Sequence, residues 1–231
     1  MIPNYNKLIS YGSAIALIGF ITSGPLGFMM VKLTKPQPVW DSASVFAANY
    51  HFLQDIPYYL GLLLIGGMLM VAVGQYLNYT EENRKVKFQL LLSLLWATAF
   101  AALIFFNYVC QTTFIRHLAL NYTPQNDSII ATFSMANPMS LSWAVEMWGY
   151  GILGVATWLM AGYYRGKNNI ISGLLILNGI VSIATIGFSI VDINWVLTTI
   201  GLIAYMFWNV LMIVLMIMIY RNSSKRNKIP G

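Results

Sequence analysis

Six long apolar stretches dominate this chain and leave it few possible folds. They are Leu8–Val31, Ile56–Leu77, Phe88–Gln111, Leu141–Tyr164, Ile170–Val191 and Trp195–Tyr220. Each has roughly the 20 residues that an α-helix needs to cross the hydrocarbon core of a bilayer. Because an unpaired backbone polar group is costly in lipid, a spanning segment of this kind is helical. The sequence therefore predicts an all-α membrane protein, a bundle of six transmembrane helices.

The composition supports this prediction and limits the number of domains. Of the 231 residues, 58% are apolar and 9% are charged, whereas a soluble domain carries about 25% charged residues. We therefore expect a single six-helix transmembrane domain over residues 1–221 and a flexible, basic cytoplasmic tail over residues 222–231. The first apolar stretch exceeds the roughly 7–15 residues of a signal peptide's apolar region, so we interpret it as a retained helix.

The basic residues predict the orientation of the chain in the membrane. Ten Lys and Arg residues flank the predicted spans on the side that holds both termini, and three, Lys32, Lys35 and Arg116, lie on the other side. By the positive-inside rule, both termini are cytoplasmic and the long first and third loops, residues 32–55 and 112–140, are outside. The net charge of +6 then reflects topology and affinity for anionic lipids. It requires no nucleic-acid partner.

A group of six ionisable residues lies in or beside the outer ends of the predicted spans. They are His51, Asp55, Arg116, His117, Glu146 and Asp192. Charge is expensive in a bilayer, and charged residues in membrane segments commonly mark functional sites. Aromatic residues crowd the same side, among them Tyr58, Tyr59 and Tyr108, and we attribute part of this crowding to an interfacial aromatic belt. The pattern predicts a polar pocket that opens outward.

Glu146 is the most informative of these residues. If the fourth span begins near Pro138, Glu146 lies about 12 Å into the helix at 1.5 Å per residue. A carboxyl group at that depth must be protonated, paired or exposed to a wet cavity. We interpret it as a proton-linked site or an anchor for a cation. The alternative is a structural salt bridge, for which Arg116 is the obvious partner.

The fifth span carries a polar stripe. Its members follow one another at spacings of 4, 3, 4 and 3 and are Asn178, Ser182, Thr185, Ser189 and Asp192. Such spacings place all five on one helical face. This face would line a cavity, or it would be a packing seam, since Ser and Thr are common where membrane helices approach closely. We further expect Asn178 to form a hydrogen bond with Asn209 of the sixth span.

The third span ends in a second polar group. Asn107 and Gln111 lie four residues apart and share a face, as do Thr113 and His117 one turn further out. Beside them, Arg116 would bind a carboxylate or phosphate, or its long side chain would extend to the interface.

His51 and Asp55 are spaced like a metal-binding or acid–base pair. Pro57, however, is typical of a first helical turn, which makes Asp55 a natural N-cap. A shared haem or metal between His51 and His117 is not predicted, and no HExxH-type spacing is present. We therefore predict no metal and no cofactor. The single cysteine, Cys110, allows no internal disulfide, and we interpret it as a buried apolar residue.

Two further local features carry expectations. Gly24-Pro25 predicts a kink in the first helix; the alternative is a broken helix whose free carbonyl groups face a ligand. Residues 42–54 of the first loop predict one short interfacial helix with Phe46 and Phe52 on its apolar face. The frequent glycines of the spans, such as Gly66, Gly67 and Gly154, indicate close helix packing.

The layout resembles bacterial six-span membrane proteins with a long first outer loop and a tight basic turn between spans four and five. Its outward pocket resembles, in architecture, the substrate-capturing membrane subunits of vitamin uptake systems. These resemblances imply a multi-pass protein of a bacterial plasma membrane, which we expect to contact membrane lipids.

From the residues we predict an outward-facing pocket that binds or transports a small polar or amphipathic molecule, with possible proton coupling. The residues expected to line it are Glu146, Asp192, Arg116, Asn107, Gln111, Asn178, Ser182, Thr185, Ser189, His51 and His117. Two alternatives stay open: a membrane-embedded enzyme acting on a lipid-like substrate at the outer leaflet, and a non-catalytic subunit bound to a partner membrane protein. No sequence motif indicates a particular enzymatic reaction.

Overall fold

The computed structural model describes residues 5–80 and 83–226, and this part of the chain is helical without a β-strand. Its α-helices are α1 (Asn6–Ser23), α2 (Pro25–Thr34), α3 (Ala43–Ala48), α4 (Ile56–Asn78), α5 (Arg84–Val109), α6 (Arg116–Leu120), α7 (Asp127–Phe133), α8 (Leu141–Tyr164), α9 (Asn169–Val191) and α10 (Thr199–Arg226). Short 3₁₀ turns η1 (Phe52–Asp55), η3 (Pro124–Asn126) and η4 (Trp195–Leu197) and a π-helix, η2 (Cys110–Ile115), connect them.

Within the described residues, five helical segments are long and apolar enough to cross a membrane. They are Asn6–Thr34, Phe52–Asn78, Arg84–Leu120, Asn169–Val191 and Thr199–Arg226. This number identifies a polytopic integral membrane protein. Helix α8, the remaining predicted span, has the predicted bounds Leu141–Tyr164 but is not among the five. Its glutamate, tryptophans and tyrosines lower its mean hydropathy.

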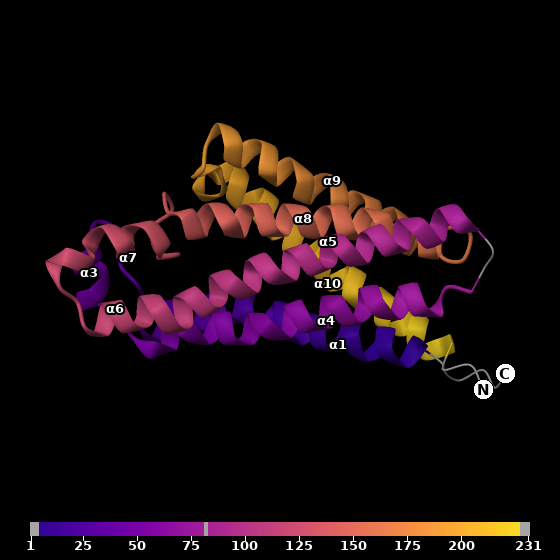
Figure 1. Cartoon of the computed structure of the whole chain (residues 1–231), viewed down its shortest axis with the longest axis horizontal. Helices are drawn as coiled ribbons and strands as arrows, with labels where there is room; N and C mark the ends of the chain where they lie inside the picture. Colours follow the sequence, from indigo (N-terminus) through magenta and orange to yellow (C-terminus); the bar gives the residue numbers. More distant parts are fainter. Residues whose placement is uncertain (1–4, 81–82, 227–231) are drawn as a thin grey trace.

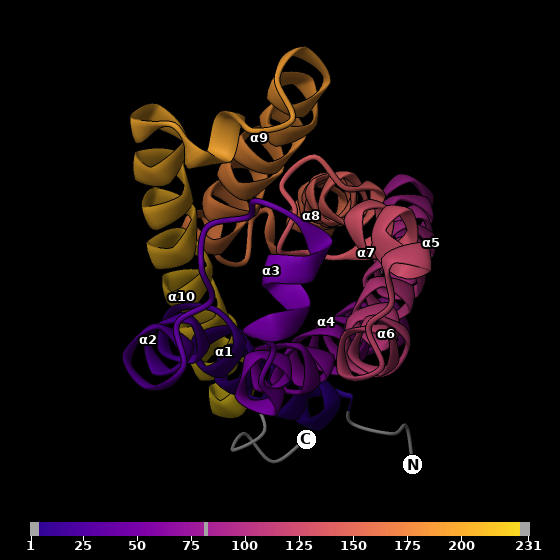
Figure 2. The same cartoon turned by 90° about the vertical axis from the view of Figure 1, so that its left-hand side faces the viewer.

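The long helices lie side by side in one elongated bundle (Figure 1). Helix α1 packs against α4, α4 against α5, α5 against α8 and α8 against α9, while α10 packs mainly against α1. Seen from the end that carries α3, α6 and α7, the near ends of α9 and α10 diverge from the other helices (Figure 2). The start of α1 and the end of α10 meet at the opposite end, where the hydroxyl oxygens of Ser10 and Ser224 lie 2.7 Å apart.

The contact between α1 and α4 depends on glycine. A Cβ atom added at Gly67 would overlap the backbone nitrogen of Ala16 and lie 2.6 Å from the carbonyl oxygen of Gly12. The neighbouring Gly66 faces open space. The prediction of a packing role is therefore confirmed for Gly67 and wrong for Gly66. The first helix is interrupted at the predicted position, because α1 ends at Ser23 and α2 begins at Pro25. The Gly24 N–H still donates to the Phe20 carbonyl oxygen and the Gly24 carbonyl oxygen accepts from the Phe28 N–H, so this is an interruption within one span.

The predicted third loop is largely helical, which corrects the expectation for residues 112–140. The segment Arg84–Leu120 continues without interruption for 37 residues, about 55 Å at 1.5 Å per residue. A hydrocarbon core is only about 30 Å thick, so this segment is longer than the core. Its Leu120 end lies with α6 and α7 in a cap over one end of the bundle (Figure 1), which we call the outer end because the sequence predicts that it faces outward.

The first loop completes this outer cap and differs from the single interfacial helix predicted for residues 42–54. It forms α3 and η1, two short segments separated by residues 49–51. Phe46 of α3 is buried in a small apolar cluster with Cys110, Ile115 and Ile130, whereas Phe52 is exposed. The apolar face therefore packs on the protein itself, and α3 lies across the end of the bundle (Figure 2).

The last long helix also differs from its predicted bounds. It begins at Thr199, four residues later than Trp195, because Trp195–Leu197 form a separate 3₁₀ turn. At the other end α10 continues to Arg226, so the first five residues of the predicted flexible tail are helical. Residues 227–231 of that tail lie outside the described part of the chain.

Candidate functional site

Glu146 lies near the outer end of α8. This helix begins at Leu141, where the Ser140 hydroxyl oxygen accepts a hydrogen bond from the Trp143 backbone N–H at 3.0 Å and caps the first turn. Glu146 is therefore about 8 Å from the helix start at 1.5 Å per residue, less than the 12 Å predicted from a start at Pro138. Its side chain is nevertheless buried, with the residue 8% exposed.

Among the described residues, the side chains that donate hydrogen bonds to the Glu146 carboxyl group are neutral. Asn107 Nδ2 lies 2.9 Å from Oε2, and the Tyr108 hydroxyl lies 3.0 Å from Oε1. The Tyr108 and Tyr150 hydroxyl oxygens lie 3.1 Å apart and extend the network. The alternative of a Glu146–Arg116 salt bridge is wrong, because Arg116 is paired elsewhere.

Gln111 connects this network to the segment between α7 and α8. Its Nε2 donates to the Phe133 carbonyl oxygen at 2.9 Å and lies 3.4 Å from Asn107 Oδ1, while its Oε1 accepts from the Met135 backbone N–H at 2.9 Å. Asn107 and Gln111 therefore share a face, as predicted. Gln111 belongs to the π-helix η2, and π-helical turns occur frequently at functional sites.

Sequence reasoning assigned Tyr108 to the aromatic belt, but the structure buries it beside Glu146. Gly61 of α4 makes room for this ring, since a Cβ atom added there would overlap it. Tyr58 of the same helix packs its ring at 5.4 Å from that of Tyr108, centroid to centroid. The spacing of Tyr58 and Gly61 on α4 could have indicated a place for a neighbouring aromatic ring. Spacing alone does not show which helix supplies that ring.

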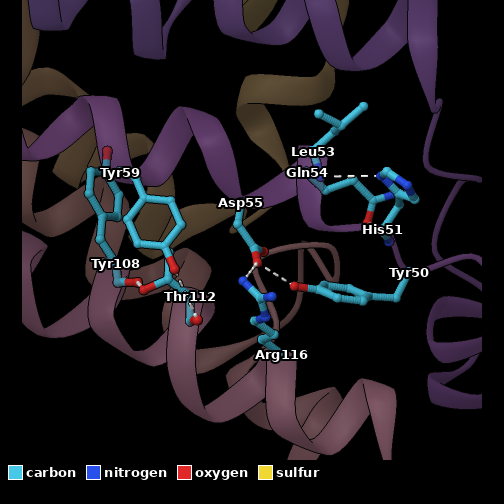
Figure 3. A network of polar contacts seen from close by, with 9 residues as sticks. All are labelled: Tyr50, His51, Leu53, Gln54, Asp55, Tyr59, Tyr108, Thr112 and Arg116. Atoms are coloured by element: carbon cyan, nitrogen blue, oxygen red, sulfur yellow. Dashed lines mark hydrogen bonds and ion pairs between the residues drawn. The ribbon is translucent and has the colours of Figure 1, made fainter.

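Asp55 anchors a second polar group at the outer end (Figure 3). Its Oδ2 accepts a hydrogen bond from the Tyr50 hydroxyl and lies 3.6 Å from Arg116 Nη1. Burial, and the neighbouring Asp55 carboxyl, raise the pKa of the Tyr50 phenol, so that it remains a neutral donor. The Asp55 side chain is 3% exposed and that of Arg116 39%. This group joins η1 to α6.

Asp55 occupies the predicted N-cap position of α4, with Pro57 in the first turn, but the predicted capping hydrogen bond is absent. His51 instead caps the 3₁₀ turn η1, where its Nδ1 accepts from the Leu53 backbone N–H at 3.3 Å. His51 and Asp55 therefore do not form the predicted alternative of a paired site.

A small cavity lies between the two polar groups. About 20 Å³ is accessible to the centre of a water molecule, which is room for roughly one water. Its polar lining comes from Gln37, Tyr50, Gln54, Asp55, Tyr58, Gln111 and Ser134. Gln111 and Tyr58 are the lining residues that reach the Glu146 network, through Asn107 and Tyr108 respectively.

The polar stripe of α9 lies apart from this cavity and makes contacts of its own. Asn178 donates to Thr157 Oγ1 at 2.8 Å, Ser182 accepts from Trp208 Nε1 at 3.1 Å, and Ser189 accepts from Trp195 Nε1 at 2.9 Å. The inner part of the stripe is therefore a packing seam with α8 and α10.

The remaining residues of the α9 stripe, Thr185 and Asp192, do not contribute to a common site. Thr185 donates to the Val181 carbonyl oxygen at 3.2 Å, and Asp192 is exposed and accepts from the Asn194 backbone N–H at 2.9 Å. The predicted Asn178–Asn209 hydrogen bond is wrong, because Asn209 Nδ2 donates to the Tyr205 carbonyl oxygen at 2.7 Å.

His117 is exposed on α6 and lies beside Asn121. Across the residues that the structure describes, no group of three or more His, Cys, Asp or Glu side chains is placed to hold a metal ion. Comparisons with protein-family models, with curated proteins and with solved structures find no match to this chain.

Proposed function

We propose that this protein binds a small polar or amphipathic molecule from the outer side of a bacterial plasma membrane and that Glu146 is the anchor of the binding site. Asn107, Gln111 and Tyr108 position that carboxyl group. On this proposal Glu146 holds a proton when no ligand is present and releases it to water as the ligand binds, so that binding or transport is linked to protons.

The proposal rests on the partners of Glu146. A buried carboxylate kept for structure is normally paired with a cation, because an unpaired charge in a low-dielectric interior is costly. Glu146 is buried, and its hydrogen-bond donors in the described part of the chain are the neutral side chains of Asn107 and Tyr108. This arrangement favours a group whose charge changes during function.

We further propose that α8 crosses the membrane and that the chain has six spans. Helix α8 has 24 residues, about 36 Å at 1.5 Å per residue, and packs between two of the apolar helices, α5 and α9. The distribution of ten basic residues against three supports cytoplasmic termini. The Glu146 network and the cavity then lie toward the outer surface.

One observation supports the alternative of a non-catalytic subunit. The outer ends of α9 and α10 diverge from the bundle (Figure 2), and they expose large apolar side chains such as Phe188, Val191, Ile203 and Met206. Lipid covers such a surface as well as a partner protein would. The enzyme alternative is less well supported, because neither histidine lies beside Glu146 as a general acid or base would: His51 caps a turn and His117 is exposed.

Native mass spectrometry tests the proposed function. The protein, purified in mild detergent, is compared with Glu146→Gln and with the control Asp127→Asn, whose carboxyl accepts from Tyr122 on the outer cap. We expect a small molecule to remain bound to the wild type and the control and to be lost from Glu146→Gln. A bare wild-type protein, or a ligand or partner protein retained by all three, would contradict the proposal.

A further inference from the structure

Charge and ring geometry around Glu146 point to the chemical class of the ligand. We propose that the group held by Glu146 is a protonated amine, which lies between the carboxylate and the rings of Tyr108 and Tyr150. This inference rests on the proposed function and specifies its ligand.

The charge balance of the outer end is the first argument. Two buried carboxyl groups, Asp55 and Glu146, lie there. In residues 5–80 and 83–226, the one ion pair between side chains is Arg116 with Asp55. Glu146 therefore lacks a cation of its own. Once Glu146 has released its proton, the carboxylate would repel an anionic ligand and would stay uncompensated beside a neutral one, whereas a protonated amine restores neutrality.

The second argument is the remaining acceptor capacity of the carboxylate. Two carboxylate oxygens offer about four lone-pair sites. The Glu146 side chain uses one on each oxygen, Oε2 for Asn107 and Oε1 for Tyr108. An ammonium group has three N–H donors and no acceptor. It would therefore fit the unused sites of the carboxylate without displacing either of these hydrogen bonds.

The third argument is the aromatic surroundings. Tyr108 packs with Tyr58 at 5.4 Å between ring centroids, and Tyr150 packs with Phe100 at 5.7 Å and with Trp208 at 5.3 Å. The faces of such rings attract cations, and this attraction strengthens in a site that excludes water. A carboxylate bordered by neutral tyrosine rings thus favours an amine with an apolar body over a small polar solute.

The route to this position starts at the outer cavity. That cavity holds roughly one water, with about 20 Å³ for its centre, so an amine requires the outer site to open. Gln111 lines the cavity and lies 3.4 Å from Asn107, the donor to Glu146. We infer that Gln111 moves aside when the amine enters.

Two probes of matched size test the inference by calorimetric titration of the detergent-purified protein at neutral pH. They are 2-phenylethylammonium and 2-phenylethanol, which differ in the presence of the charged nitrogen. We expect the wild type and Asp127→Asn to bind the ammonium probe at least about tenfold more tightly than the alcohol, about 1.4 kcal/mol. In Glu146→Gln this preference is expected to disappear.

Equal affinity of the wild type for the two probes would overturn the inference, and this comparison requires no variant to fold. A preference that survives Glu146→Gln would overturn it as well. If native mass spectrometry finds a neutral molecule held through Glu146, the proposed function stands and the amine inference fails. If it finds no ligand that depends on Glu146, the proposed function itself fails.

Discussion

Replacing Gly67 with leucine is expected to disrupt the bundle. The added Cβ atom would overlap the Ala16 backbone nitrogen, and backbone atoms of α1 cannot rotate away as a side chain can. Helices α1 and α4 would have to separate along a contact that small residues permit. Overpacking typically costs about 1–3 kcal/mol of unfolding free energy. We expect Gly67→Leu to lose about 3 kcal/mol or more. Thermal unfolding in detergent measures the loss.

The adjacent Gly66 supplies the matched control. A Cβ atom at Gly66 meets nothing within 4 Å, so Gly66→Leu should change the unfolding free energy by less than about 1 kcal/mol, within the range of exposed substitutions. Similar melting temperatures for Gly67→Leu and Gly66→Leu would contradict the close α1–α4 contact.

Removing the charge of Arg116 is expected to produce the second large effect. In Arg116→Gln the Asp55 carboxylate, with its side chain 3% exposed, would keep only its hydrogen bond from Tyr50. Breaking a fully buried pair costs about 3–5 kcal/mol. Because the Arg116 side chain is 39% exposed, we expect a smaller loss of about 2–3 kcal/mol in unfolding free energy, measured in detergent.

A second substitution distinguishes an unpaired charge from lost packing. In the double variant Arg116→Gln/Asp55→Asn the Asp55 position carries no charge, so most of the stability lost in Arg116→Gln should return. Arg84→Gln, an exposed arginine at the opposite end of the bundle, is the control and should be nearly neutral. If the double variant is no more stable than Arg116→Gln, the ion pair does not hold η1 to α6.

Local signals in the sequence predicted several parts of the fold correctly. Helix α8 has the predicted bounds because Ser140 caps its start and the chain turns at Gly166, whose φ of 77° favours glycine. The interruption of the first helix at Gly24-Pro25 likewise follows from a local signal, since proline cannot continue the helical hydrogen bonding. Asn107 and Gln111 share a face because a spacing of four residues fixes their relative direction on a helix.

Contacts between helices were harder to predict, because spacing leaves the rotation of each helix about its axis undetermined. Asn178 and Asn209 were paired because they lie at similar depth on two spans joined by a short turn, yet Asn178 faces Thr157 of α8. The pairing of Arg116 with Asp55 depends on how η1 folds over the bundle. Tyr108 was assigned to the interface, because its own helix does not reveal that it is buried. The room for its ring comes from Gly61 of a different helix.

The central claim is that Glu146 serves ligand binding and not the fold, and the stability of the ligand-free protein tests it most directly. Thermal unfolding is compared between the wild type and Glu146→Gln after bound molecules have been washed away, since a ligand would itself raise the melting temperature. Groups kept for function commonly lower stability, so we predict an equal or higher melting temperature for Glu146→Gln. A structural carboxylate would contribute about 1.5–3 kcal/mol through its hydrogen bonds. A melting temperature lower by several degrees would therefore contradict the account.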